Sequence, residues 1–360
     1  MLAVMRVFGV LLLVAACDRV YGLSGRGEDA AIDTLDVMSD SAMEVCGGDG
    51  FVRVCSFVLD SVVTLRNTID TGTDARCQAH RVVNGVADAC VIVADDITVQ
   101  FTLRAVGARP LLLFATHGIT VSAPIDVSSD RAGEPGAGAR TDCASTNGVM
   151  GASSGGGGGG GTYQYAGGPG GSAGTAPGGG PRAVSPLSAL AGGCAGGLGG
   201  GTAPLTVAGA GGGAIYLIAG TSIQIDATGG IDASGAGGSG GAAQHGGGGG
   251  GSGGLIGLDA PSIVIAGNII AKGGAGGGGG DMAMGAFGAE AVLAAPNAGV
   301  AGGAGGGTGG SGGDGSNGTI GGTPNGTPIA GGGGGGGGAG HVLVYGVRTG
   351  GGILNPAASP

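Results

Sequence analysis

Cysteines are the residues whose chemistry is easiest to predict from this sequence, which contains seven of them. Six lie beyond the N-terminal region: Cys46, Cys55, Cys77, Cys90, Cys143 and Cys194. An even number of cysteines in an exported chain predicts disulfides, with about fifteen possible pairings for six residues. We expect nearest neighbours to pair: 46 with 55, 77 with 90, and 143 with 194. The sequence has no Cys-x-x-Cys motif and no cysteine–histidine cluster, so no metal site is expected.

The first cysteine, Cys17, directly follows a short apolar stretch. Arg6 supplies a positive charge, and residues 7–14 are apolar but too few to span a bilayer. The spacing Val14-Ala15-Ala16-Cys17 resembles a bacterial lipobox, in which the cysteine thiol takes a diacylglyceryl group and becomes the new N-terminus. The resemblance implies lipidation of Cys17 and stable anchoring by several acyl chains. The alternative is an ordinary secretory signal cleaved elsewhere. Either way we expect export, and on the lipobox interpretation a membrane-anchored lipoprotein at the outer membrane or cell surface.

Two acidic groups could in principle bind calcium or act in catalysis. Asp95 and Asp96 are adjacent, as paired acids would be, but neighbouring residues of a strand point to opposite faces. Aspartate is also common at turns, and a corner is predicted there. The stretch Asp70–Asp74 resembles part of a calcium loop but lacks the later glutamate. We interpret both groups as turns.

The other candidates for chemistry are weaker. The four histidines, His80, His117, His245 and His341, are scattered along the chain, which favours structural roles. The run of seven glycines at 155–161 has no following Lys-Ser/Thr pair, so it is not a phosphate-binding loop. The sequence therefore predicts no catalytic residue, no cofactor and no enzymatic activity.

Composition narrows the class of protein. The chain has 360 residues and 97 glycines, of which only ten precede residue 111. Collagen is excluded because no strict three-residue period with proline is present. A net charge of −10, with Lys272 as the only lysine, provides no basic surface, so no nucleic-acid partner is expected.

Short apolar segments recur between the glycines, and their alignment defines a repeat. Each copy has an apolar strand, a corner, the pattern I-x-[V/I], a second corner and the pattern I-x-[V/A]. The repeat positions in three copies are Ile119/Val121/Ile125, Ile223/Ile225/Ile231 and Ile263/Ile265/Ile269. Two upstream copies place Val63, Leu65 and Ile69, and Ile97, Val99, Phe101 and Leu103, at these positions. A last copy begins at His341, and we expect it to be truncated by the C-terminus.

This pattern predicts an all-β fold, a short right-handed parallel β-helix. The segments have the two-residue period of strands and lack convincing hairpin dipeptides. One coil cannot bury its apolar face alone, whereas stacked coils bury a continuous column. Leu65, Val99, Val121, Ile225 and Ile265 should then align at one lateral position. The alternatives are an antiparallel sandwich and a largely disordered chain.

Glycine-rich inserts interrupt the copies after Val127, Ala233 and Ala271. We expect them to be partly polyproline-II-like or disordered and to cover the outer face of the first strand of each copy. They should leave from one edge, near Ser128, Ser234 and Lys272. The expected organisation is a signal peptide (1–16), a tether and cap (17–54), first coils (55–130), an insert (131–212), coils (213–272) with an insert at 235–254, an insert (273–340) and a terminal strand and tail (341–360).

Three features together resemble a known group of proteins. They are the lipobox, the segment Arg109–Ser129, and the alternation of "SIQIDATGG" and "SIVIAGN" with glycine tracts. This combination resembles the glycine-rich surface lipoproteins of GC-rich Gram-negative bacteria. The tracts alone are similar to those of mycobacterial PGRS-type surface proteins, whose N-terminal domain is absent here.

We therefore expect a lipid-anchored cell-surface protein with a structural, adhesive or interaction role. Its expected partners are the membrane, through the lipid, and a surface glycan or protein. The alternative is a β-helix protein that binds or degrades polysaccharide. A lyase needs basic and acidic side chains gathered on one face, and the inner copies contain almost none.

Overall fold

The computed structural model describes residues 44–56, 60–77, 81–84, 88–202, 206–316, 321–327 and 329–359. All of them belong to the second of two units, Met43–Pro360, the first being Met1–Ala42. Cys17 and the signal segment lie outside the described residues. No described segment forms a helix with the length and apolar character that crossing a bilayer requires.

The described residues form strands and no helices, which confirms the all-β class. The strands are β1 (Val45–Gly47), β2 (Arg53–Ser56), β3 (Asp60–Asp70), β4 (Arg81–Asn84), β5 (Cys90–Val106), β6 (Leu111–Val121), β7 (Pro124–Asp126), β8 (Ala214–Ala219), β9 (Ser222–Ile225), β10 (Gly230–Asp232), β11 (Leu255–Ile265), β12 (Asn268–Ile270), β13 (His341–Thr349) and β14 (Leu354–Asn355). Strands β1, β2 and β4 make a small antiparallel sheet.

The other eleven strands make one sheet in which every pair is parallel. Its main path runs β13-β11-β8-β6-β5-β7-β10-β12-β14, with β3 beside β5. The long strands β6 and β11 pair with β8 along their first halves and with β9 along their second halves. These four strands thereby close a small parallel ring. The parallel pairing excludes an antiparallel sandwich for this sheet.

Register follows the sequence repeat. Leu65, Val99, Val121, Ile225 and Ile265 are successive Cα partners across the parallel strands. A second column joins Leu103, Ile125, Ile231, Ile269 and Leu354. The predicted alignment of the five positions is confirmed. Residues of both columns lie in one buried apolar core, with Leu354 packed at its margin.

Three details of the predicted repeat are wrong. Ile69 pairs with Ala105, not with Leu103, because the register between β3 and β5 shifts after Leu65. Phe101, placed on the repeat in the same copy, is exposed. The last copy is also not truncated after its first strand, because β13 continues to Thr349 and β14 pairs with β12.

A second apolar core lies on the outer face of the first strand of each copy. It contains Phe114, Tyr216 and Leu343 from the sheet. The cap supplies Val52 and Val54, and the first glycine insert supplies three further side chains, those of Tyr163, Leu187 and Leu190. The expectation that inserts cover this face is therefore only partly met, because residues 45–54 of the cap form much of the cover.

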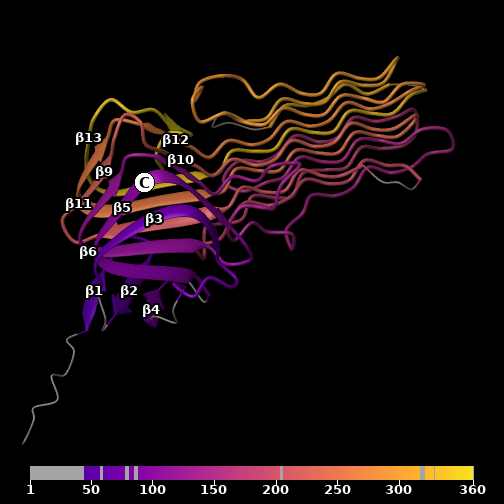
Figure 1. Cartoon of the computed structure of the whole chain (residues 1–360). Helices are drawn as coiled ribbons and strands as arrows, with labels where there is room; N and C mark the ends of the chain where they lie inside the picture. Colours follow the sequence, from indigo (N-terminus) through magenta and orange to yellow (C-terminus); the bar gives the residue numbers. More distant parts are fainter. Residues whose placement is uncertain are drawn as a thin grey trace, which may run out of the picture. The chain divides into compact units, whose positions relative to one another are not determined.

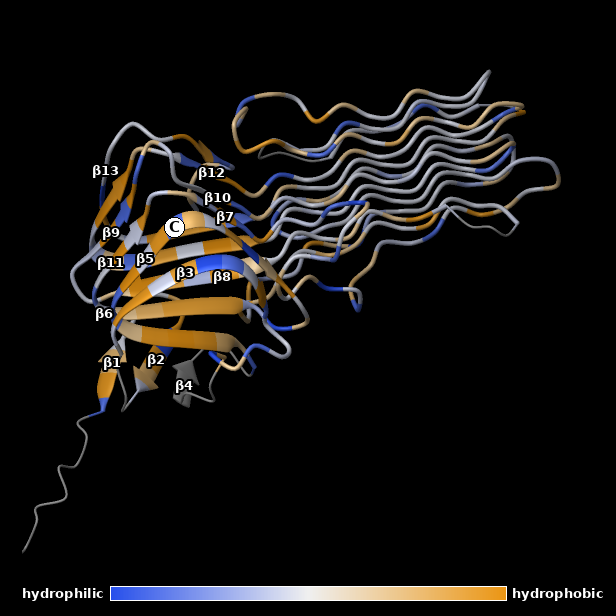
Figure 2. Ribbon diagram, viewed as in Figure 1, coloured by the Kyte–Doolittle hydropathy of each residue, from blue (hydrophilic) through white to orange (hydrophobic). Residues whose placement is uncertain are grey.

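The glycine-rich inserts 131–212, 235–254 and 273–340, which we call the glycine bundle, run side by side away from the strands (Figure 1). Their exits are adjacent, as predicted: Ser129 N donates to Ser234 O at 2.9 Å, and Gly235 N donates to Lys272 O at 2.9 Å. Figure 2 shows the strands mainly hydrophobic and the bundle near neutral. The bundle therefore presents little hydropathic contrast along most of its length.

Backbone hydrogen bonds organise the bundle with a period of three residues. In the run 155–161, Gly155, Gly158 and Gly161 donate to the carbonyls of Gln244, Gly247 and Gly250. The intervening amides donate to two other neighbours, at 168–171 and 146–149. Three residues per turn without internal hydrogen bonds is the geometry of polyproline II. These described residues have fixed partners, so the expectation of disorder is not met there.

Glycine is needed because the neighbouring backbones pack so closely. A Cβ atom on Gly334 would lie 2.0 Å from the carbonyl oxygen of Gly248, and one on Gly158 would lie 2.0 Å from that of Gly197. Any side chain there would overlap a neighbouring peptide group. The close packing explains why the inserts contain long uninterrupted glycine runs.

Candidate functional site

The six predicted cysteines form three disulfides in the predicted pairing: Cys46–Cys55, Cys77–Cys90 and Cys143–Cys194. The first joins β1 to β2, the second ties the turn after β3 to the start of β5, and the third lies within the first insert. Glu44 lies close to the Cys46 and Cys55 sulfurs. Those sulfurs are shared in a disulfide, so they do not provide the thiolate ligands that a metal needs.

The acidic candidates have separate partners. Asp95 accepts a hydrogen bond from the Thr116 hydroxyl at 2.8 Å, while Asp96 accepts one from the Gly118 amide at 3.0 Å. Asp70 caps its own turn, with hydrogen bonds from the Gly72 amide and the Thr73 hydroxyl that lower its pKa. Neither group forms a shared carboxylate site.

The described histidines have different surroundings, and His80 lies outside the described residues. His117 is exposed, with Nδ1 3.9 Å from Asp96 Oδ2. His341 stacks edge-on against Tyr163, with ring centroids 4.8 Å apart. Its Nε2 is buried without a partner among the described residues, and burial lowers the pKa of His341 to about 4. A half-buried neutral imidazole with a packed ring fits a structural role.

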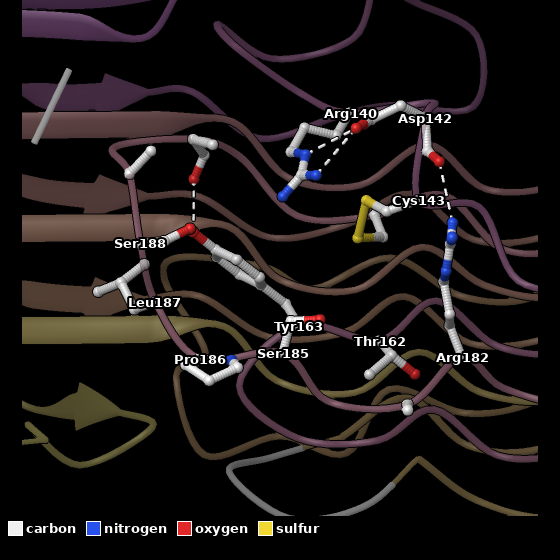
Figure 3. A pocket seen from close by; sticks show the side chains of 14 residues that line it. Arg140, Asp142, Cys143, Thr162, Tyr163, Arg182, Ser185, Pro186, Leu187 and Ser188 are labelled. Carbon is white, nitrogen blue, oxygen red and sulfur yellow. Dashed lines mark hydrogen bonds and ion pairs between the residues drawn. A yellow bond between two sulfur atoms is a disulfide. The ribbon is translucent and has the colours of Figure 1, made fainter. Parts of the chain in front are cut away.

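A cavity of about 390 Å³ opens where the first insert passes the disulfide Cys143–Cys194 (Figure 3). Arg140 makes a two-pronged ion pair with Asp142, at 3.0 and 2.9 Å, which raises the pKa of Arg140 and lowers that of Asp142. Arg182 donates to the Asp142 backbone carbonyl at 2.9 Å. The Tyr163 hydroxyl donates to Ala191 O at 2.8 Å.

The residues around this cavity form a loop that is held by a disulfide, an ion pair and hydrogen bonds. Its polar groups mostly satisfy one another, and burial raises the pKa of Tyr163 well above its usual range. The serines of its rim, Ser185 and Ser188, have no histidine or carboxylate within hydrogen-bond reach in the described part of the chain. No nucleophile–base pair of the kind that hydrolases use is present among these lining residues.

An outer face of the parallel sheet carries a regular row of side chains. Successive Cα partners there are Thr64, Thr98, Thr120, Gln224, Val264 and Thr349. The Thr64 and Thr98 hydroxyls are 3.1 Å apart. The row is partly polar and has no aromatic side chain, so it offers no stacking platform for a sugar ring.

A different kind of surface lies on one edge of the glycine bundle. Met282, Met284, Phe287 and Val292 are all more than 45% exposed, with Met282 at 91%. Met284 and Phe287 are three residues apart, which places them on one side of a chain with a three-residue turn. The Arg131 guanidinium covers the Phe287 ring, with Cζ 4.4 Å from its centroid. We call residues 282–292 the apolar edge.

Sequence patterns did not reveal a buried polar cluster near the insert exits. Lys272 is fully buried, and Asp232 and Asn355 are less than a tenth exposed. Asp232, Ile270 and Asn355 are successive Cα partners on β10, β12 and β14. Burial raises the pKa of Asp232 to about 7 and lowers the pKa of Lys272. One feature of the sequence could have indicated this cluster: Lys272 is the only lysine, and it directly follows an apolar strand.

Comparison with protein-family models, with curated proteins and with solved structures finds no significant match to this chain. The disulfides indicate an oxidising compartment outside the cytoplasm. Within that setting the described residues offer a parallel sheet, an ordered glycine bundle, an apolar edge and a buried polar cluster.

Proposed function

We propose that this protein is a lipid-anchored cell-surface component with a structural and adhesive role and no catalysis. Its parallel ladders would be the faces of a short right-handed β-helix, the usual hand for parallel connections. The lipid on Cys17 would hold this β-helix at the outer membrane or cell surface. The β-helix would in turn carry the glycine bundle.

The observation that carries the proposal is the three-residue hydrogen-bond repeat of the glycine bundle. A glycine run alone behaves as a flexible coil, but these amides have fixed partners on neighbouring segments. A projecting bundle with few charged groups among its described residues is suited to spacing or contact.

Anchoring is tested on the full-length protein produced in a Gram-negative host. The wild-type protein should fractionate with membranes, and its N-terminal peptide should carry acyl chains by mass spectrometry. Cys17→Ala should be released from the membrane fraction, whereas Cys77→Ala, which removes another cysteine, should stay membrane-bound. An intact signal sequence or cleavage at another residue would refute the anchor.

Adhesion is tested at the apolar edge. All the exposed large apolar side chains of the bundle segment 281–300 belong to it. Cells displaying the protein should bind to polystyrene, and the double variant Met284→Ser/Phe287→Ser should bind several-fold less. Val264→Ser, which removes an exposed apolar side chain from the sheet face and not from the bundle, is the control for position and should bind as wild type. Equal binding by all three proteins would contradict an adhesive role for this edge.

A separate experiment tests the polysaccharide alternative. The row from Thr64 to Thr349 could donate and accept hydrogen bonds with sugar hydroxyls, although it has no aromatic side chain to stack on a ring. A glycan array probed with the purified protein should show no binding above background. Binding that is lost in Thr98→Val/Thr120→Val would replace the proposal with a glycan-binding role.

A further inference from the structure

We propose that Lys272 and Asn355 become joined by an intramolecular isopeptide bond between the lysine Nζ and the asparagine Cγ. The bond would link the residue where the third insert begins, just after β12, to β14 near the C-terminus. This inference is independent of the lipid anchor and of the adhesive role. It concerns the buried polar cluster alone.

The two side chains meet at one backbone oxygen. Lys272 Nζ donates to the carbonyl oxygen of Pro296 at 3.2 Å, and Asn355 Nδ2 donates to the same oxygen at 2.8 Å. The two nitrogens are therefore separated by no more than the sum of these two distances. Backbone pairing also holds their strands together, because Ile270 and Asn355 are Cα partners and Ala271 N donates to Asn355 O at 2.8 Å.

The surroundings of Lys272 are unusual for a lysine. Its side chain is completely buried, and Nζ donates to the carbonyls of Pro296 and Ala298. Among the described residues no carboxylate oxygen lies within ion-pair distance of it. A fully buried lysine without an ion pair is rare, because burying an unpaired ammonium is costly. An uncharged nitrogen, as in an amide, would remove that cost.

The local electrostatics favour the reactive form of the amine. Burial lowers the pKa of Lys272, which favours the neutral amine, and outweighs the Asp232 carboxylate, which acts in the opposite direction. Desolvation of this kind is a general way of making a lysine nucleophilic. Burial also raises the pKa of Asp232 to about 7, so the neighbouring acid carries a proton for much of the time at neutral pH.

The reaction needs no oxidant and no co-reactant. The lone pair of neutral Lys272 Nζ attacks Asn355 Cγ and forms the new C–N bond. The bond from Cγ to Nδ2 breaks, and a proton from Nζ passes to the departing nitrogen, which leaves as ammonia. The product is a secondary amide, and the chain loses the mass of one ammonia.

The bond would close a loop that contains the whole third insert. Residues 273–340 leave the sheet just after Lys272 and return at β13, and β14 follows. The terminal pair β12–β14 is short, with two residues in register. A covalent link at this point would prevent the last strand from separating from the sheet and releasing one end of the glycine bundle.

A tryptic map of the reduced, denatured full-length protein tests the bond directly. Lys272 is the only cleavage site between Arg182 and Arg348, so an unmodified chain yields separate peptides 183–272 and 273–348. With the bond, trypsin cannot cut at Lys272. We expect one species, peptide 183–348 joined to peptide 349–360, lighter than their summed masses by one ammonia.

Variants identify the partners. Asn355→Ala should restore cleavage at Lys272 and give peptides 183–272 and 273–348, and Lys272→Met should leave peptide 349–360 free. Asn268→Ala, which removes another side-chain amide that bonds to the third insert, is the control and should keep the cross-link. Free peptide 273–348 of unmodified mass from the wild-type protein would overturn the proposal. A link from Lys272 to Asp232, seen as loss of water, would also overturn it. The wild-type measurement does not depend on the folding of any variant.

Discussion

At the scale of single residues, glycine and buried polar groups determine which substitutions this protein tolerates. Interior glycines of the bundle leave no room for Cβ, whereas a Cβ on Gly299 would have no atom within 4 Å. The titratable groups Asp232, Lys272 and His341 all have pKa values displaced by burial. Substitutions at these positions should therefore have effects that the same change elsewhere would not have.

The first prediction compares two glycines. Gly334→Ala should destabilise the protein by about 2 kcal/mol or more, because its Cβ would lie 2.0 Å from a backbone oxygen that cannot move alone. Gly299→Ala, with nothing within 4 Å, should be neutral or slightly stabilising. Urea unfolding of both variants measures the difference. Equal stability would show that the bundle is looser than the hydrogen bonds imply.

The second prediction is a pH dependence at His341. Its pKa is lowered to about 4 in the folded protein, so below the ordinary value near 6.5 the unfolded chain binds a proton that the folded chain does not. Stability should fall as pH decreases from about 6.5 to about 4. His341→Phe keeps an aromatic edge against Tyr163 and should remove this loss, gaining about 3 kcal/mol relative to wild type near pH 4.

Urea unfolding of both proteins at pH 4, 5, 6.5 and 8 measures this difference. The Asp232 carboxyl, whose pKa of about 7 makes stability fall as pH rises, is present in both proteins and cancels in the comparison. A constant difference between the two proteins across this pH range would contradict the assignment of a neutral His341.

At the scale of elements, the parallel strands are held by columns of side chains in register. Alternate residues of β9 face the core: Ile223 and Ile225 are buried, while Gln224 between them is exposed. Each inward residue touches its partner in the strand above and below. The outward residues contribute little to this core.

The third prediction uses that alternation. Ile225→Ala should cost about 2–5 kcal/mol, because it leaves a cavity in a column that backbone pairing prevents from collapsing. Gln224→Ala, its exposed neighbour on the same strand, should change stability by less than about 0.5 kcal/mol. Thermal or urea unfolding distinguishes the two. If Gln224→Ala lowered the free energy of unfolding as much as Ile225→Ala, the outer face of β9 would have to be covered by other residues.

At the scale of the whole unit, distant segments are brought together by the inserts. Cys143–Cys194 closes a loop within the first insert, with a sequence separation of 51. Tyr163 and Leu190 from the same insert pack on the outer core beside Phe114 and Leu343. The first insert therefore couples the glycine bundle to the sheet.

The fourth prediction concerns that disulfide. The chain-entropy model assigns about 4 kcal/mol to a loop of this size, and less where the segment already has fixed partners. Cys143→Ala/Cys194→Ala should therefore cost about 2–4 kcal/mol, with exposure of the Tyr163 region to proteolysis. Cys46→Ala/Cys55→Ala, which opens a loop of separation 9, should cost less. The reverse order would mean that the first insert holds itself together without the disulfide.

Features that depend on local pattern can be predicted from the sequence. Two-residue alternation located the strands, the recurrence of I-x-[V/I] aligned Val99, Val121, Ile225 and Ile265, and nearest-neighbour spacing identified the three disulfides. These succeed because a repeat with one register has few alternative ways to bury its apolar side chains.

Contacts between segments far apart in the chain could not be predicted from the sequence and emerge only in the folded protein. The shift that moves Ile69 to Ala105 arises from one local irregularity between two strands and has no sequence signature. The partners of each glycine run could not be predicted, because identical residues carry no information about which neighbour they face. Lys272 and Asn355 meet at Pro296 for the same reason: the contact joins three segments that only the packed inserts bring together.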